Sequence, residues 1–163
     1  MTEHPIIVAG AGIGGLAAAA GLAQKGFRTI VVEQAAILGE IGAGIQIGPN
    51  AFHAFDYLGV SDAARAQAVY VDSLRLMDAK SGNDITSIPL GEDFRKHMGN
   101  PYAVVHRADL HSVLLDFCEA SELIEIRTDT VVQSYEQDGS SVTLNTSKGP
   151  IKGAALIGAE GLR

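Results

Sequence analysis

The sequence has one cysteine, Cys118, and no tryptophan among its 163 residues. A single cysteine excludes a disulfide within the chain, and the five histidines show no spacing typical of metal ligands. Cys118 stands in the apolar stretch HSVLLDFCEA, which predicts a buried small side chain rather than a reactive thiol. The sequence therefore favours neither a metalloprotein nor a disulfide-stabilised domain.

Positive charge is also scarce, because 12 lysines and arginines face 19 aspartates and glutamates, for a net charge of −7. Without a basic cluster to neutralise phosphates, we expect no sequence-independent binding of nucleic acid. Long apolar runs are missing too, since the longest one near the N-terminus is interrupted by glycines and lacks a basic flank. We therefore expect no signal peptide, no membrane span and a cytoplasmic location.

Glycine, by contrast, is abundant, with 19 residues that fall in clusters. Clustered glycines favour contacts made through the backbone rather than a flexible linker. Such contacts suit a dinucleotide, which helix dipoles and amide groups can bind even in an acidic chain. The length and the apolar fraction of 47% are typical of a globular protein with one or two domains.

The beginning of the chain predicts a β-α-β unit. An apolar strand at 5–9 is followed by an alanine-rich helix over 14–25 and a second apolar strand at 28–33. Such a crossover is right-handed and its two strands are parallel. The predicted fold class is therefore α/β, with a parallel sheet.

The rest of the chain combines helices with antiparallel strands. Asn50 is expected to cap a helix over 51–58, and Ser61 another over 62–68. Residues 71–90 alternate apolar and polar side chains around the turn sequence SGND, which predicts an antiparallel hairpin. The other predicted elements are a strand at 102–106, a helix at 108–120, a three-stranded meander at 130–137, 141–146 and 149–152, and a strand AALIGA.

The motif GAGIGG stands between the first strand and the first helix. Gly10 permits the tight turn, Gly12 lets the backbone approach a pyrophosphate, and Gly15 allows close packing of helix and sheet. Glu33 ends the second strand, where a carboxylate can bind ribose hydroxyls or be an ordinary strand-end acid. Because a carboxylate there repels a 2′-phosphate, the pattern favours FAD or NAD over NADP. The neighbouring candidate cofactor-binding residues are Ile13, Gly14 and Gln34.

A second glycine run, LGEIGAGIQIGPNA at 38–51, raises the question of a second phosphate-binding loop. Its glycines are separated by isoleucines in an extended alternating pattern, and the spacing G-x-G-x-x-x-G is one residue too long. The next helix is expected to begin only after Pro49 and Asn50. We therefore expect one nucleotide site rather than two.

Four segments, in this order, resemble the FAD-dependent aromatic hydroxylases, the single-component flavoprotein monooxygenases. They are GAGIGG with Glu33, GEIGAGIQIGPNA, HRADLHSVLL and LIGAEG. The resemblance covers essentially the whole chain and leans toward members that hydroxylate hydroxybenzoate or salicylate rings. It implies a Rossmann-like FAD-binding domain over 1–70 and 100–163, with 71–99 as the first segment of a substrate domain.

The resemblance also implies roles for individual residues. Gly44 and Ile45 would pass beside the flavin ring of FAD, and Arg107, in the RADL pattern, would bind the flavin cofactor. Glu160 stands where the family has an aspartate, in a loop associated with the pyrophosphate and with the nicotinamide donor. On the residues alone, Arg107 can also be a surface arginine at a helix start, and Glu160 a strand-end carboxylate.

The activity that the resemblance implies is hydroxylation of a hydroxybenzoate-type ring through a flavin C4a-hydroperoxide. FAD would be the cofactor, NADH or NADPH the electron donor, and O2 and a small aromatic substrate the reactants. Family members are more than twice as long, so the chain is expected to be an N-terminal portion whose catalytic residues lie beyond residue 163. Association with a further copy of the chain stays open. Another FAD-dependent oxidoreductase and a catalytically silent cofactor-binding fragment remain as alternatives.

Overall fold

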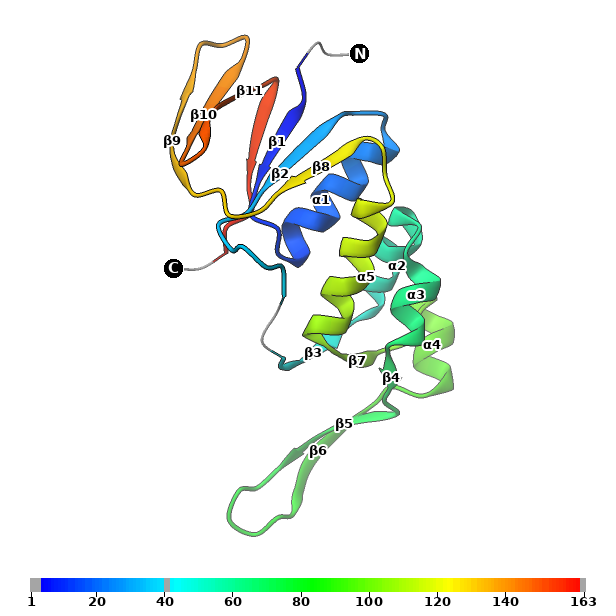
Figure 1. Cartoon of the computed structure of the whole chain (residues 1–163). Coiled ribbons are helices and arrows are strands. Elements are labelled where there is room, and N and C mark those ends of the chain that lie inside the picture. Colours follow the sequence, from blue (N-terminus) through cyan, green and yellow to red (C-terminus); the bar gives the residue numbers. More distant parts are fainter. Residues whose placement is uncertain (1–3, 40–41, 162–163) are drawn as a thin grey trace. The chain divides into compact units, whose positions relative to one another are not determined.

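The computed structural model describes residues 4–39 and 42–161 (Figure 1). The chain divides into two compact units: unit 1 comprises Met1–Ile41 with Leu110–Arg163, and unit 2 comprises Gly42–Asp109. Helix α5 (Arg107–Glu119) begins in unit 2 and continues through unit 1. Unit 1 contains the motif GAGIGG, and unit 2 contains the last three glycines of the second run.

Unit 1 is built around a four-stranded parallel sheet. Its strands are β1 (Ile6–Ala9), β2 (Thr29–Val32), β8 (Ile124–Arg127) and β12 (Ala155–Gly158), in the order β12-β1-β2-β8. Apolar β-branched residues predominate in the two central strands, and β2 is buried along its whole length, as in parallel strands that are covered on both faces. The parallel pairing of β1 with β2 confirms the predicted β-α-β unit.

One face of this sheet packs against an antiparallel meander. The meander consists of β9 (Val132–Gln137), β10 (Val142–Thr146) and β11 (Gly149–Gly153), as predicted. Because successive side chains of a strand point to opposite faces, residues two apart in β1 and β2 join the same layer. They form one apolar cluster with the meander, made of Ile7, Ala9, Ile30, Val32, Val142, Leu144 and Ile151.

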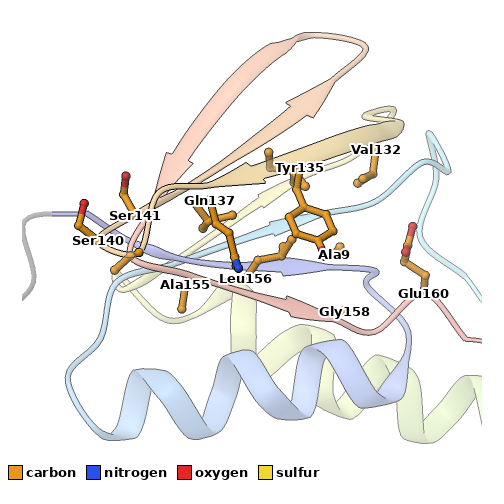
Figure 2. Close-up of a pocket in the computed structure, with 14 residues that line it drawn as sticks. Ala9, Val132, Tyr135, Gln137, Ser140, Ser141, Ala155, Leu156, Gly158 and Glu160 are labelled. Atoms are coloured by element: carbon orange, nitrogen blue, oxygen red, sulfur yellow. The ribbon is translucent and has the colours of Figure 1, made fainter.

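The other face of the sheet is covered by α1 (Ile13–Gln24), and Figure 2 shows the blue helix and the orange meander strands on opposite sides of the sheet. The buried residues of α1 are mostly small, which lets the helix lie close to the strands; they are Gly15, Leu16, Ala19 and Ala20. Helix α5 packs against α1, and the Cys118 thiol donates a hydrogen bond of 3.4 Å to the Leu16 carbonyl oxygen. Cys118 is fully buried, as predicted.

Unit 2 contains a three-stranded antiparallel sheet of β3 (Gly44–Ile47), β7 (Ala103–His106) and β4 (Val69–Tyr70), in the order β3-β7-β4. The face with Ile47, Ala103 and Val105 is buried. Phe52 of α2 (Pro49–Leu58) covers it, with its ring centroid 6.4 Å from that of Tyr70. The opposite face, called here the open face, carries Gly44, Gln46, Val69, Val104 and His106.

A hairpin extends from this sheet, as the alternating pattern predicts. Strands β5 (Ser73–Met77) and β6 (Asp84–Pro89) pair antiparallel, and α4 (Glu92–Met98) leads the chain back toward β7. At the tip, the Asp78 carboxylate accepts hydrogen bonds from the amide and the hydroxyl of Ser81 and from the amide of Lys80, and these bonds lower its pKa. The assignment of 71–99 to a substrate domain stays a prediction.

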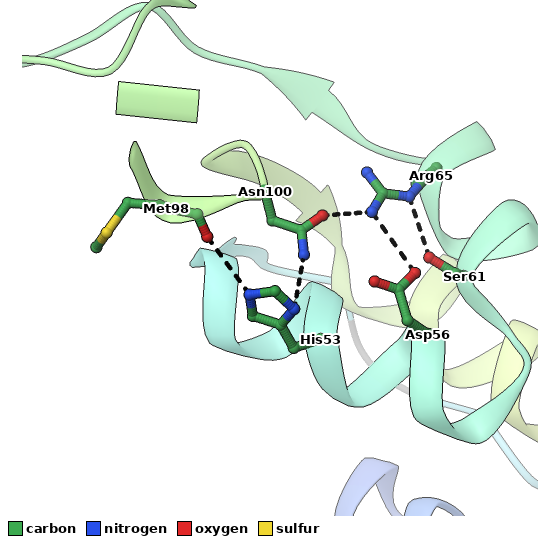
Figure 3. Close-up of polar contacts among 6 residues, drawn as sticks. All are labelled: His53, Asp56, Ser61, Arg65, Met98 and Asn100. Atoms are coloured by element: carbon green, nitrogen blue, oxygen red, sulfur yellow. Dashed lines mark hydrogen bonds and ion pairs between the residues drawn. The ribbon is translucent and has the colours of Figure 1, made fainter. Parts of the chain in front are cut away.

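A polar network joins the end of α4 to α2 and to α3 (Ser61–Ala66), as Figure 3 shows. Arg65 donates hydrogen bonds to Asn100 Oδ1 at 2.5 Å and to Ser61 Oγ at 3.0 Å. Because a guanidinium can only donate, Asn100 presents its NH2 group to His53 Nδ1, 3.1 Å away. His53 Nδ1 is therefore the acceptor, and Nε2 donates to the Met98 carbonyl oxygen at 3.4 Å.

Two predicted helix caps are wrong. Helix α2 begins at Pro49 with Gly48 as its N-cap, so Asn50 lies inside the first turn. Proline favours the first helical position because its φ is already helical and its missing N–H is not needed there. Ser61 is likewise the first residue of α3, after the N-cap Val60.

Candidate cofactor site

The glycine motif forms the turn between β1 and α1. Gly10 has a φ of +106°, a conformation that residues with a side chain rarely adopt. A Cβ on Gly10 would overlap the carbonyl oxygen of Ala159, and a Cβ on Gly15 would overlap the carbonyl oxygen of Gly10. Both positions are therefore glycine because the chain's own backbone occupies the space.

The amino end of α1 is suited to bind an anion. Its N-cap Gly12 is extended, and within the described residues no side chain caps this end. The first turn contains no acidic residue. Gly14 is exposed, and a Cβ there would meet no described atom within 4 Å. Because the first amides of a helix lack intrahelical partners and the helix dipole favours negative charge, this end fits a pyrophosphate.

Glu33 lies beside this turn, directly after the carboxyl end of β2. Its Oε2 accepts a hydrogen bond from the Ala11 amide at 2.9 Å, and its Oε1 accepts one from the Ala35 amide at 2.9 Å. Each carboxylate oxygen has a second acceptor position, which can receive a hydroxyl donor. The paired hydroxyls of a ribose are donors of this kind, so the position of Glu33 fits the adenosine side of a dinucleotide.

His111 is a second contact to the same loop, and the sequence analysis did not assign it. Its side chain is buried, with 4% exposed, and Nε2 lies 2.8 Å from the Ala11 carbonyl oxygen. Since a carbonyl only accepts, Nε2 carries the hydrogen and donates it. Ala11 is thus held through its amide by Glu33 and through its carbonyl by His111. The partners are 100 residues apart, and no local pattern signals such a pair.

The segment after β12 lies against the glycine motif. The Ala159 amide donates a hydrogen bond to the Ala9 carbonyl oxygen at 2.7 Å. Glu160 follows and lines a cavity of about 630 Å³ together with Tyr135 of the meander and Leu156 of β12 (Figure 2). The structure therefore brings Glu160 to the same end of the sheet as the glycine motif, while its binding role stays a prediction.

The residues predicted near the flavin ring lie in unit 2. Gly44 in β3 is directly opposite His106 in β7, and the Arg107 amide donates to the Ala43 carbonyl oxygen at 3.0 Å. Gly44 is exposed, and a Cβ there would meet nothing that the structure describes within 4 Å. Ile45, the next residue, is half-buried. The backbone at Gly44 is therefore accessible to a planar group.

The second glycine run is not a second dinucleotide loop, although one reason for that prediction is wrong. Helix α2 does not begin after Asn50, because it begins at Pro49, directly after β3 and the N-cap Gly48. However, β3 pairs antiparallel with β7, and the whole β3-β7-β4 sheet is antiparallel. Strand β3 and helix α2 are therefore not part of a parallel β-α-β unit.

The predicted cofactor-binding residues thus fall into two groups, each within one unit. Unit 1 holds Gly10, Gly12, Ile13, Gly14, Gly15, Glu33, Gln34 and Glu160, and unit 2 holds Gly44, Ile45 and Arg107. Their contacts to a cofactor stay predictions.

Neither Cys118 nor a cluster of metal-ligating side chains forms a second candidate site within the described residues. Burial and the charge of Glu119 raise the pKa of Cys118 to about 11, so the thiol is neutral at physiological pH and a poor nucleophile. Within residues 4–39 and 42–161, no group of three histidine, cysteine or acidic side chains is placed to hold a metal ion. In the part of the chain that the structure describes, no helix is both long and apolar enough to cross a membrane.

Comparison with known proteins identifies the class. The family described as FAD binding domain matches residues 3–163. The chain therefore belongs to the FAD-binding domain family, and FAD is its cofactor. This result confirms the resemblance found in GAGIGG, in the second glycine run, and in the RADL and LIGAEG segments.

Particular relatives are hydroxylases. The chain is 52% identical over 161 residues to 3-hydroxybenzoate 6-hydroxylase 1 of Aquipseudomonas alcaligenes, and the match covers 98% of this chain and 41% of that protein. It is also 52% identical over 162 residues to 3-hydroxybenzoate 6-hydroxylase of Polaromonas naphthalenivorans, and this match covers 99% of this chain and 40% of that protein. Among solved structures, HpxO of Klebsiella pneumoniae in complex with FAD and uric acid matches with a TM-score of 0.82 and 29% identity, covering 99% of this chain and 40% of that one. The chain thus spans about 40% of the length of these relatives.

Proposed function

We propose that the chain is the FAD-binding part of a monooxygenase that hydroxylates a hydroxybenzoate-type ring. The observation that carries this proposal is the Glu33 carboxylate, held by the Ala11 amide beside the amino end of α1, which no described side chain caps. These two features suit the ribose hydroxyls and the pyrophosphate of an adenine dinucleotide. The 52% identity with two 3-hydroxybenzoate 6-hydroxylases supports the reaction and the substrate class.

In this proposal, each group of residues binds a different part of FAD. The amides at the start of α1 hold the pyrophosphate, and Glu33 accepts hydrogen bonds from the adenosine ribose. Gly44 and Ile45 pass beside the flavin ring, Arg107 binds the flavin cofactor, and Glu160 lies in the loop near the pyrophosphate. When bound, FAD supplies the redox chemistry, by taking hydride from NADH or NADPH and reacting with O2 in its reduced form.

Flavin content tests the proposal first. Purified full-length protein is expected to show a flavin absorbance spectrum, and chromatography of the released compound should identify FAD. Oxygen uptake with NADH or NADPH and a panel of hydroxybenzoates then identifies donor and substrate, and mass spectrometry detects the added oxygen atom. Protein without FAD would overturn the proposal. Bound FAD without hydroxylation of any aromatic compound would favour another FAD-dependent oxidoreductase.

A Glu33→Gln variant tests the adenosine contact. Hydrogen bonds to charged groups contribute about 1.5–3 kcal/mol, so we expect the dissociation constant for FAD to rise roughly tenfold or more. Titration of the apoprotein with FAD measures it. Glu122→Gln, at an exposed position of unit 1, is the matched control and should bind FAD like the wild type. Equal affinities of the two variants would remove Glu33 from the site.

The cytoplasmic location and the association of copies expected from the sequence also belong to the proposal. Cell fractionation tests the location, and light scattering on the purified protein tests the association. Neither result changes the assignment of FAD to the glycine motif.

A further inference from the structure

We propose that His106 is a positioning residue of the cofactor site, whose imidazole holds the Gly42–Ile45 segment in place by packing on Gly42. The inference rests on the proposed function, because it assigns the space beside Gly44 to the flavin cofactor. His106 ends β7 and is exposed, so the hydrophobic core does not explain its placement.

The first observation is the contact between His106 and Gly42. A Cβ built on Gly42 would overlap the His106 ring, and its three nearest atoms would be Nε2, Cε1 and Cδ2 of that ring. The imidazole therefore occupies the position that a side chain at residue 42 would take. With the His106 ring in this position, residue 42 has no room for a side chain.

The second observation is the backbone pairing on either side of this contact. Gly44 is directly opposite His106, and Ile45 is opposite Val105. The hydrogen bond from the Arg107 amide to the Ala43 carbonyl oxygen makes these two residues a hydrogen-bonded pair. Gly44 and His106 then form the adjacent pair without such bonds, in which the two chains approach more closely. The His106 side chain therefore leaves the sheet on the same face as Gly44.

The third observation is the contrast between the two glycines on this face. The space at Gly42 is filled by the imidazole, whereas the space at Gly44 contains no described atom within 4 Å. A planar group placed over Gly44 would lie next to the His106 ring. Loss of that ring would remove the contact at Gly42, while the pairing of β3 with β7 would remain. The expected defect is thus local to the cofactor site.

A double-mutant cycle on full-length protein tests the proposal. His106→Ala removes the ring, and Gly42→Ala displaces it by occupying its place. We expect each single variant to raise the dissociation constant for FAD about tenfold. In the double variant the new methyl group meets no ring, so its affinity should equal that of His106→Ala. The visible absorbance spectrum of the bound flavin should shift in the same direction in all three variants.

Matched controls separate this role from a general loss of stability. His97→Ala, at an exposed position of unit 2, and Gly91→Ala, at a half-buried one, change the same residue types, and a Cβ on Gly91 would meet no described atom within 4 Å. Both should keep the wild-type affinity and flavin spectrum. His106→Phe retains a flat ring over Gly42 and should recover most of the affinity that His106→Ala loses. If His106→Ala does not fold, His106→Phe and Gly42→Ala still test the contact.

The outcomes distinguish this proposal from the one on which it rests. Wild-type protein that binds no FAD would overturn the proposed function and this inference together. Wild-type protein that binds FAD, with a His106→Ala variant of unchanged affinity and spectrum, would overturn this inference alone. Additive losses in the double variant would also overturn it, because residues that act through one contact are not additive.

Discussion

Gly10 and Gly15 of unit 1 differ from Gly44 of unit 2 in what surrounds them. A Cβ on Gly10 or Gly15 would overlap a carbonyl oxygen of the chain itself. Gly44 lies in a strand, where glycine is unfavourable, yet a Cβ on it would meet nothing described within 4 Å. Packing explains the glycines at positions 10 and 15, whereas no described neighbour explains the glycine at position 44. The proposed FAD site would explain it.

Gly15→Ala should produce the largest effect, because the new methyl group would overlap backbone rather than a movable side chain. We expect the free energy of unfolding to fall by about 3 kcal/mol, despite the better helix propensity of alanine. Denaturant titration measures it. Gly14→Ala is the matched control one residue away, with free space around the new methyl group, and should not lose stability. Equal stabilities of the two variants would show that packing does not require glycine at position 15.

His111→Leu tests whether a hydrogen bond, in addition to backbone packing, stabilises the glycine motif. It leaves the carbonyl oxygen of Ala11 without its buried donor, which should cost about 1–3 kcal/mol of unfolding free energy. FAD affinity should fall as well, because the loop that carries Gly12 loses a support. His111→Gln keeps a donor and should restore part of both losses. A leucine variant as stable as the wild type would show that the hydrogen bond is dispensable.

Gly44→Val tests the glycine that has free space around it. Its stability should stay within about 0.5 kcal/mol of the wild type, because the side chain enters free space on the open face. Its dissociation constant for FAD should rise about tenfold, since the added atoms compete with the flavin ring. Gly44→Ala should show a smaller rise. Normal FAD affinity and turnover in the valine variant would remove residue 44 from the cofactor site.

We expect the smallest effect on stability from a change at Asp138. This residue lies in the turn between β9 and β10, which contains none of the glycines compared above. Hydrogen bonds from the side chain and amide of Ser140, and from Ser141, hold the pKa of this carboxyl well below its usual value. A group with a lowered folded pKa stabilises the fold above its unfolded value and loses that contribution as the pH falls below about 4. The melting temperature of the wild type should therefore exceed that of Asp138→Asn at neutral pH. A difference that did not shrink in acid would exclude this cause.

Regular patterns account for the parts of the fold that the sequence predicts. The β-α-β unit, the hairpin and the meander each show a clear period or a turn sequence. Strand β8 and helix α4 were not predicted. Strand β8 has only four residues and is incompletely buried, and α4 has seven residues, none of them buried, so neither shows a strong apolar pattern.

The candidate site also contains residues that the sequence predicts and contacts that it does not. Glu33 and the glycines are recognisable because the motif and the strand end are close in sequence. The contacts of His111 with Ala11 and of His106 with Gly42 are not, because each joins distant segments through one side chain. The cap of α2 was misplaced because Asn50 is a favourable cap residue, and the proline before it decided the helix start.

The position of Cys118 allows the separation of helices α5 and α1 to be measured by thiol labelling. The thiol lies where α5 meets α1, donates to the Leu16 carbonyl oxygen, and has a pKa of about 11. Reagents that react with thiolates must therefore wait until these helices part, and their labelling rate measures how often this happens. A ligand bound at the amino end of α1 should slow the labelling. Cys118 is the one cysteine of these 163 residues, so labelling of this part of the protein requires no introduced probe.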